Sequence, residues 1–309
     1  MSNLNQKDMQ NIEMQMYNRS RDIDVAIYNG MFSDLPKEYV LDSLLMYQNQ
    51  DGGFGSGLYI DNYNPSSTVY VTYEALRTLY VCGFDKFSNE ELYNGLINKA
   101  MNYLYNRSSI IKNKWNHNIE SNSKFAHSDF FTNKKENLEM CGYYPTISIY
   151  ALTLWLCNEK KAYYKKAYNG LKIALNEVLA NSNPSKYEIM ACGLVVEICN
   201  KLNLFTEEVS KLNEKMVNLV KTVISSKETW PNLEMPVILT DGLVLDEELN
   251  TKVEENLDYL IANRATFGLW EAFHKWGTVY PEEDSAKLKW IGYISWNYLY
   301  LLNKHKKIA

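Results

Sequence analysis

The sequence lacks an apolar segment long enough to cross a bilayer. The uncharged apolar stretch at residues 290–302 is short and contains Ser295 and Asn297, whereas a membrane-spanning helix needs about 20 predominantly apolar residues. The N-terminal residues, MSNLNQKD, have neither the basic region nor the apolar core of a secretory signal. We therefore expect a cytoplasmic protein without a transmembrane segment.

Cysteine is present, but not in a pattern used for cross-linking or metal binding. The five cysteines include no CxxC pair, and their number is odd. This pattern argues against a disulfide framework and against a structural zinc cluster. We expect the thiols to lie in the core, and we predict no metal and no cofactor.

The sequence also lacks an excess of positive charge. Lys and Arg number 32 against 37 Asp and Glu, which gives a net charge of −5. Nucleic acids and anionic membranes both favour a concentrated basic surface, so neither is expected as a partner. With 46% hydrophobic residues, the chain has ample material for a core.

Patterns typical of β-strands are nearly absent. The short apolar runs at residues 237–239 and 243–245 cannot seed a sheet, whereas Val69, Tyr73 and Leu76 fall on one face of a helix. Helices are predicted at residues 6–28, 67–81, 144–158, 186–202 and 284–304, with a less regular one after Met235. No Pro-, Gly- or Ser-rich linker divides the chain, so we expect one all-α domain covering residues 1–309.

One glycine-rich turn separates two of the predicted helices. It reads Gln48-Asn-Gln-Asp51-Gly52-Gly53-Phe54-Gly55. Side-chain bonding by Asp51 and a positive φ at Gly52 allow the chain to reverse direction, so we interpret the turn as a structural joint. A phosphate-binding loop is disfavoured because the preceding segment is helical and Ile60 occupies the position of the third glycine.

This turn resembles the QW-type repeat of the prenyltransferase and squalene/terpene cyclase superfamily, in which Gln is followed by Asp-Gly-Gly, an aromatic residue and Gly. Later turns, at Trp230 and at Gly268-Leu-Trp270, keep only the aromatic position. The resemblance implies an α/α toroid, an inner ring of helices within an outer ring, covering nearly the whole chain. It also implies a central apolar cavity, open at one end, for an apolar small-molecule substrate of isoprenoid type.

Within the superfamily the chain is most similar to uncharacterised bacterial prenyltransferase-like proteins, around residues 115–146 and 268–282. The motifs of the two well-known chemistries are missing. There is no Asp-x-Asp-Asp, with which terpene cyclases protonate an alkene, and no Asp-x-Cys zinc pair of the protein prenyltransferases. The nearest acidic cluster, Glu282-Glu-Asp284, follows a proline and is typical of a helix start.

Residues 112–138 form the main candidate site, because a long connection between helices commonly serves as a lid or a binding loop. If Glu120 and His127 converge on a desolvated cavity, they could act as general acid and base. Trp115 and His117 are predicted to lie at the cavity wall. The alternatives are a surface loop held by hydrogen bonds and a metal site formed by His117, Glu120 and His127.

Two further segments supply candidates. Glu271 is a possible acid within an aromatic segment, and aromatic faces can stabilise a carbocation, although Trp270 also fits a packing role between helices. Asp61 could be an acid at the cavity mouth, while Ser66 or Ser67 fits a helix N-cap. The remaining side chains predicted to line the substrate cavity are Tyr63, Tyr144, His274, Trp276 and Tyr280.

Three functions remain open from the sequence. The first is an enzyme that cyclises an isoprenoid or transfers a prenyl group. The second is a noncatalytic lipid-binding or scaffold protein on the same fold. The third is a carbohydrate-active enzyme, which requires a pair of cavity-facing acids such as Glu120 and Glu271.

Overall fold

The regular structure of the protein is almost entirely helical, as predicted. The computed structural model describes residues 3–88, 90–273, 275–278 and 280–309. Its α-helices are α1 (Gln6–Arg19), α2 (Asp22–Phe32), α3 (Glu38–Leu45), α4 (Val69–Val81), α5 (Glu91–Asn102), α6 (Lys135–Met140), α7 (Thr146–Leu156), α8 (Ala162–Ala180), α9 (Lys186–Leu202), α10 (Thr206–Val223), α11 (Pro236–Leu239), α12 (Glu247–Ala262) and α13 (Glu282–Lys304). The all-α class is therefore confirmed.

Short elements lie in the connections between these helices. They are a π-helical turn at Tyr103–Arg107, 3₁₀ turns at Glu120–Lys124, Asp129–Phe131 and Lys227–Thr229, and a hairpin of β1 (Ile110–Ile111) and β2 (Lys114–Trp115). The hairpin pairs Ile110 with Trp115 in antiparallel register. The apolar run at residues 237–239, which could have been a strand, belongs to α11.

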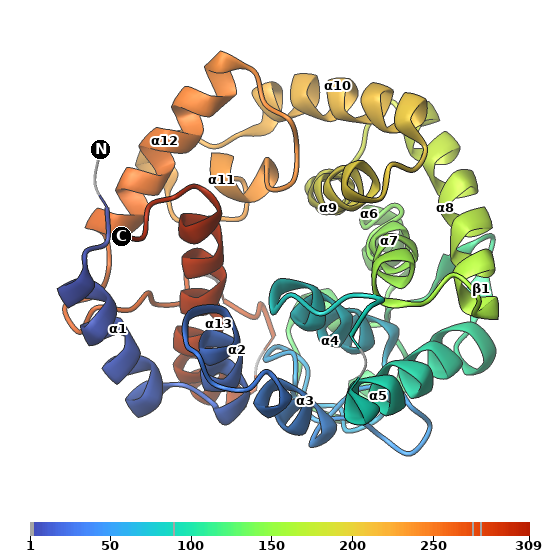
Figure 1. Ribbon diagram of the computed structural model, residues 1–309, viewed down its shortest axis with the longest axis horizontal. Coiled ribbons are helices and arrows are strands. Elements are labelled where there is room, and N and C mark those ends of the chain that lie inside the picture. Colours follow the sequence, from blue (N-terminus) through green and yellow to red (C-terminus); the bar gives the residue numbers. More distant parts are fainter. Residues whose placement is uncertain (1–2, 89, 274, 279) are drawn as a thin grey trace.

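The helices lie in two layers. Figure 1 shows α1, α5, α8, α10 and α12 around the periphery and α4, α7, α9, α11 and α13 nearer the centre. Helix α7 packs on both α4 and α9 in the inner layer, and α8 packs on α10 in the outer layer. Successive helix pairs therefore run around the molecule.

Burial explains which helices occupy which layer. In α7 only Trp155 is not fully buried, so this helix is apolar on every side. In α10 the buried residues form a single stripe that includes Val209, Leu212 and Met216. A helix with one apolar stripe can face water, whereas one that is apolar all round must be enclosed by others.

The two ends of the described chain meet. The amide of Leu4 donates to the carbonyl of Lys307 at 2.8 Å, and the amide of Ala309 donates to the carbonyl of Leu4 at 3.0 Å. Helix α13 packs against both α1 and α2. The last helix thus completes the arrangement by contacting the first two.

The predicted first helix, residues 6–28, is in fact two helices. Ser20 and Arg21 are extended between α1 and α2, which allows α2 to turn back against α13. The Arg21 guanidinium pairs with buried Asp24 at 2.7 Å and donates to the carbonyls of Gly57 and Leu58. These tertiary contacts outweigh the local preference for one continuous helix.

The glycine-rich turn connects α3 to the segment before α4. Gln48 Nε2 donates to the carbonyls of Gly52 and Leu96, both at 3.0 Å, and so ties the turn to α5. Asp51 Oδ1 accepts hydrogen bonds from the Gly53 amide and the Ser67 hydroxyl. The motif therefore joins three helices.

Three aromatic turn residues make the same backbone contact. The amides of Phe54, Trp115 and Trp270 each donate to a hydroxyl on the following inner helix. These hydroxyls belong to Thr72, Thr146 and Ser295, at 3.1, 3.0 and 3.2 Å respectively. Of the two later turns, Trp270 shares this contact with Phe54, whereas the Trp230 amide donates to the Lys227 carbonyl instead.

The described helices include none that is long and apolar enough to cross a membrane.

Candidate functional site

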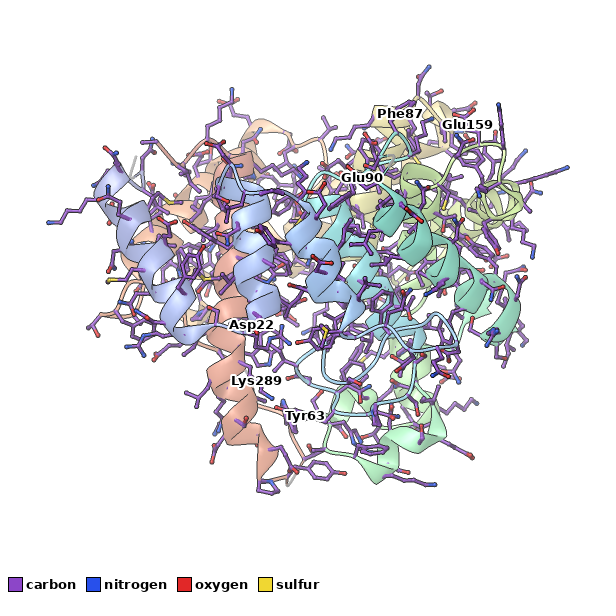
Figure 2. The ribbon with its side chains drawn as sticks, turned by 60° about the horizontal axis from the view of Figure 1, so that its bottom comes forward. Asp22, Tyr63, Phe87, Glu90, Glu159 and Lys289 are labelled. Atoms are coloured by element: carbon purple, nitrogen blue, oxygen red, sulfur yellow. The ribbon has the colours of Figure 1, made fainter. Side chains whose placement is uncertain are left out.

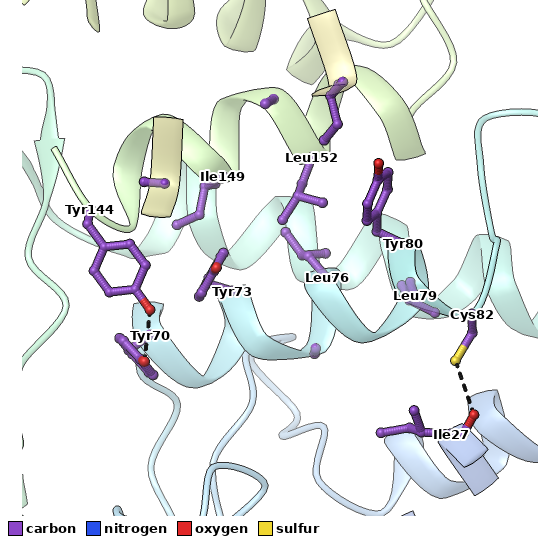
Figure 3. Packing of buried hydrophobic residues seen from close by; sticks show 14 of the residues in the cluster. Ile27, Tyr70, Tyr73, Leu76, Leu79, Tyr80, Cys82, Tyr144, Ile149 and Leu152 are labelled. Atoms are coloured by element: carbon purple, nitrogen blue, oxygen red, sulfur yellow. Dashed lines mark hydrogen bonds between the residues drawn. The ribbon is translucent and has the colours of Figure 1, made fainter. Parts of the chain in front are cut away.

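A cavity of about 570 Å³, the main cavity, is lined by α4, α9, α13 and their connecting loops. Helix α4 contributes residues 70, 73, 74, 77, 80 and 81, which recur at helical spacing on one face. Figure 3 shows Tyr70, Tyr73 and Tyr80 along this helix. The volume lies within the range of about 300–1,000 Å³ typical of small-molecule sites.

Aromatic rings form much of the cavity wall. The Tyr59 ring lies with its centroid 4.9 Å from that of Tyr70, 5.5 Å from that of Phe131 and 5.9 Å from that of Trp290. These rings meet edge to face or at a tilt, the arrangement that aromatic quadrupoles favour. The aromatic cluster surrounds the N-terminal end of α4.

Two tyrosines join α4 to the start of α7. The hydroxyls of Tyr70 and Tyr144 lie 2.9 Å apart within hydrogen-bond distance, as Figure 3 shows. Burial raises the pKa of both phenols well above the usual value, so both remain protonated near neutral pH. Tyr144 lines the main cavity, where the sequence placed it.

A polar group lies farther along α4. Glu74 Oε2 accepts a hydrogen bond of 2.8 Å from the Tyr293 hydroxyl, and Arg77 Nη2 donates to Asn297 Oδ1 at 2.7 Å. Burial raises the pKa of Glu74, although the nearby Arg77 opposes this. Burial also disfavours the Arg77 cation, but Tyr293 and Glu74 raise the Arg77 pKa by more.

Asp61 is held at the cavity by two indole groups. Its Oδ1 accepts hydrogen bonds from the indole nitrogens of Trp276 at 2.6 Å and Trp290 at 2.7 Å. Asp61 and Trp276 both line the main cavity and are almost fully buried. The structure thus brings together two residues that lie 215 positions apart.

Tyr63 and Tyr280 lie beside the cavity lining rather than in it. The Tyr63 ring is 5.9 Å from Trp276, and its hydroxyl accepts a hydrogen bond of 2.8 Å from Lys289. Figure 2 shows Tyr63 and Lys289 as neighbours. The Tyr280 ring lies 6.4 Å from that of Trp276 and 5.4 Å from that of His127. Both tyrosines therefore pack near Trp276, outside the main cavity lining.

The structure does not bring Glu120 and His127 together in the cavity. Glu120 is exposed on a 3₁₀ turn, and neither residue lines the main cavity. His127 is buried, with Nδ1 2.7 Å from the Phe125 carbonyl and Nε2 3.4 Å from the Thr132 hydroxyl. The desolvated acid and base pair expected from the sequence is thus not formed, because the loop turns Glu120 toward solvent.

The same loop nevertheless reaches the main cavity through other residues. Ser128, Asp129, Phe130 and Phe131 line it. The Phe130 and Phe131 rings pack against Tyr70 at 5.3 and 5.0 Å. Residues 112–138 therefore contribute aromatic side chains to the cavity wall, whereas the sequence predicted that they contribute a general acid and base.

Trp115 and His117 have structural positions away from the cavity. The Trp115 indole donates to the Leu104 carbonyl at 2.9 Å, and the Trp270 indole donates in the same way to Leu260 at 2.8 Å. His117 is buried against Phe130, and burial lowers its pKa to about 4. Both predicted wall residues are thus buried in packing positions outside the main cavity lining.

Glu271 is exposed and lines a separate cavity of about 480 Å³, together with Trp270, Arg264 and Tyr298. It is not part of the main cavity lining. His274, predicted beside it, lies outside the described residues. The acid pair required for glycoside hydrolysis, Glu120 and Glu271, therefore does not face one cavity.

Sequence reasoning missed Glu74 and Arg77. The apolar face predicts the helix but does not single out the two charged residues between the tyrosines. A signal was nevertheless present, because Tyr70, Tyr73, Arg77 and Tyr80 share one helix face. A charged residue within such a stripe indicates a cavity rather than a sealed core.

No cluster of metal ligands is found in the parts of the chain that the structure describes. Among these residues, no three His, Cys, Asp or Glu side chains are grouped so that they could hold an ion.

Comparison with protein-family models, with curated proteins and with solved structures gave no match.

Proposed function

We propose that the chain forms an α/α toroid of the prenyltransferase and terpene cyclase type. Support comes from the alternation of peripheral and central helices in Figure 1 and from the contact of α13 with α1 and α2. The repeated amide-to-hydroxyl bond of Phe54, Trp115 and Trp270 adds further support. Such repetition is expected where each turn belongs to one structural repeat.

On this fold, we infer that the protein is an enzyme acting on a long apolar substrate of isoprenoid type inside the main cavity. The observation that carries the proposal is the aromatic wall around Tyr59, which includes Tyr70, Phe131 and Trp290. Such a wall excludes water from an apolar chain, and its ring faces stabilise positive charge that develops during cyclisation or prenyl transfer.

Asp61 and Glu74 are the acids best placed to take part. Both line the main cavity, Asp61 among the aromatic rings and Glu74 beside Arg77. The two indole hydrogen bonds fix the Asp61 carboxylate at the aromatic end, where it can stabilise a cation in the cavity. They take the place of Glu120, His127 and Glu271 in the proposed mechanism.

The test is product analysis after incubation with a panel of isoprenoid alcohols, acids, diphosphates and neutral polyenes. Wild-type protein is expected to form a new product from at least one of them. Asp61→Asn removes the negative charge and should lower kcat about 100-fold or more, as loss of a preorganised electrostatic contact does.

Glu120→Gln is the matched control, because it neutralises an acid that is exposed and outside the cavity. This variant should retain wild-type turnover. Equal loss in both variants would contradict the assignment to Asp61, and no turnover of any panel member by wild type would contradict the enzyme proposal. An apolar molecule retained through native mass spectrometry without turnover would instead identify a carrier.

A further inference from the structure

Arg77 lines the main cavity with the Asn297 amide as its hydrogen-bond partner, while the charges of Glu74 and Asp241 act on it from beyond ion-pair distance. Arg77 belongs to the inner helix α4, keeps part of its surface accessible, and lines the cavity. Its hydrogen bond to Asn297 and its position 5.4 Å from the centroid of Trp296 hold the guanidinium in place. In the part of the chain that the structure describes, no carboxylate forms an ion pair with it.

This arrangement leaves much of the guanidinium's bonding capacity unused. The group presents several N–H donors in a planar fork that matches a carboxylate or a phosphate, and Asn297 accepts from only one of its nitrogens. The remaining donors can therefore bind an anionic group of a ligand in the cavity.

The acids that line the cavity already have partners. Asp241 pairs with Lys304, Asp129 pairs with Lys134 at 3.2 Å, and Asp61 accepts the two indole hydrogen bonds. Glu74 accepts from Tyr293. Asp61, Glu74 and Arg77 thus all have neutral hydrogen-bond partners, and Arg77 is the cation among these three.

The charge balance of the wall limits how much negative charge a ligand can carry. The charged lining residues that the structure describes are Asp61, Glu74, Asp129 and Asp241 on one side and Arg77 and Lys275 on the other. A diphosphate would add several negative charges to a lining that already has more acids than bases, and the described residues form no metal-binding cluster to offset them. A single carboxylate matches the one guanidinium.

The position of Arg77 along α4 separates a polar region from an apolar one. Arg77 follows Tyr70 by seven residues, which corresponds to about 10 Å along a helix axis. The aromatic cluster of Tyr59, Tyr70 and Phe131 lies at the Tyr70 end. A molecule with its head at Arg77 can therefore place its tail among the rings.

We propose that the ligand of the main cavity is a long-chain acid, with its carboxylate bound by Arg77 and its apolar chain among the aromatic rings. This inference rests on the proposed function and specifies its substrate class.

The decisive measurement compares three probes that share one tail: farnesoic acid, farnesol and farnesyl diphosphate. Binding to wild-type protein can be followed by tryptophan fluorescence, since Trp276 and Trp290 line the cavity, and by calorimetry. The acid is expected to bind about 10- to 100-fold more tightly than the alcohol, the value of a charge-assisted hydrogen bond. It should also bind more tightly than the diphosphate.

Variants test whether Arg77 causes the preference for the acid. In Arg77→Met, the Kd for the acid should come within about threefold of the Kd for the alcohol. Arg77→Lys keeps the charge but loses the planar fork of donors, so it should keep part of the preference for the acid. Arg107→Met removes an exposed arginine outside the cavity and should change nothing. Circular dichroism and thermal unfolding establish that each variant is folded.

The possible results separate this inference from the proposed function. Equal binding of acid and alcohol by wild type, or tightest binding of the diphosphate, overturns the carboxylate inference but leaves an apolar-substrate cavity. A preference for the acid that survives in Arg77→Met also overturns it. If no probe binds wild type more tightly than Leu194→Trp, in which a cavity-lining side chain is enlarged, the proposed function fails as well.

Discussion

The cavity residues differ in how far the sequence could reveal them. Asp61 was a candidate because it is an acid in a loop just before a helix, and the structure places it in the main cavity. Its indole partners, Trp276 and Trp290, come from the other end of the chain. No local pattern encodes such contacts. The sequence therefore identifies Asp61 as a candidate acid but does not predict its hydrogen-bond partners.

Glu74 and Arg77 escaped prediction for a different reason. An inner helix has two buried sides, one against its neighbours and one toward the cavity. The apolar spacing of Val69, Tyr73 and Leu76 identifies the helix, but it does not separate the packed side from the cavity side. Only the tertiary arrangement makes that distinction.

At this scale, His117 should contribute a measurable pH dependence of stability. Burial lowers its pKa to about 4 from 6.5, so the unfolded chain binds the proton more tightly than the folded one. Stability is therefore retained above about pH 6.5 and lost progressively as the pH falls toward 4. The loss attributable to this residue should approach 3 kcal/mol.

Urea unfolding of wild type and His117→Phe at a series of pH values tests this expectation. The phenyl ring keeps the contact with Phe130 but cannot be protonated. Near pH 8, the free energy of unfolding of the two proteins should change with pH to a similar extent. Between pH 6.5 and 4, the variant should lose less stability than wild type. Parallel curves throughout would show that His117 does not titrate as stated.

At the scale of elements, helices were well predicted and their connections were not. The boundaries of α4, α9 and α13 follow apolar spacing, and Ser185 caps α9. The N-cap of α4 is Thr68, whose side chain accepts from the Val71 amide, and the prediction of Ser66 or Ser67 as the cap was wrong. The loop of residues 112–138 has no periodic signal. The sequence therefore gives no reason to place its phenylalanines, rather than its polar residues, in the cavity wall. Exposure of Glu120 and burial of Phe131 are settled by tertiary packing.

The glycine-rich turn should be sensitive to a single methyl group. Gly52 has a φ of 97°, and a Cβ at this position would meet the carbonyl oxygen of Lys99 in α5. Gly52→Ala should therefore destabilise the protein by about 2 kcal/mol or more, from backbone strain together with the collision. Thermal and urea unfolding measure the change.

Gly95 provides a matched control within α5. It lies inside the helix, and a Cβ there would meet open space. Gly95→Ala should stabilise the protein by about 0.5–1 kcal/mol because alanine has the higher helix propensity. An equal effect of the two substitutions would show that the turn does not have the strained, close-packed role assigned to it.

At the scale of the whole molecule, the chain end contacts predict long-range coupling. Leu4 is fully buried and forms hydrogen bonds with both Lys307 and Ala309. Leu4→Ala should lower the free energy of unfolding by about 2–5 kcal/mol through the cavity left behind. Hydrogen exchange should increase at α1 and at the end of α13 together.

Leu288→Ala is the corresponding control, because Leu288 lies on α13 but is 67% exposed. Its effect should stay within about 0.5 kcal/mol. Faster exchange confined to α1 after Leu4→Ala would indicate that the two ends are not coupled.

The pairing of Leu4 with Ile308 holds the start of the described chain against its end. On the proposed toroid, each helix is restrained by neighbours on both sides, so the ring cannot widen at one point without a compensating movement elsewhere. The width of the main cavity around Arg77 then depends on all of these helices, including residues far from the cavity. A substitution at Leu4 is therefore expected to change which molecules fit the cavity.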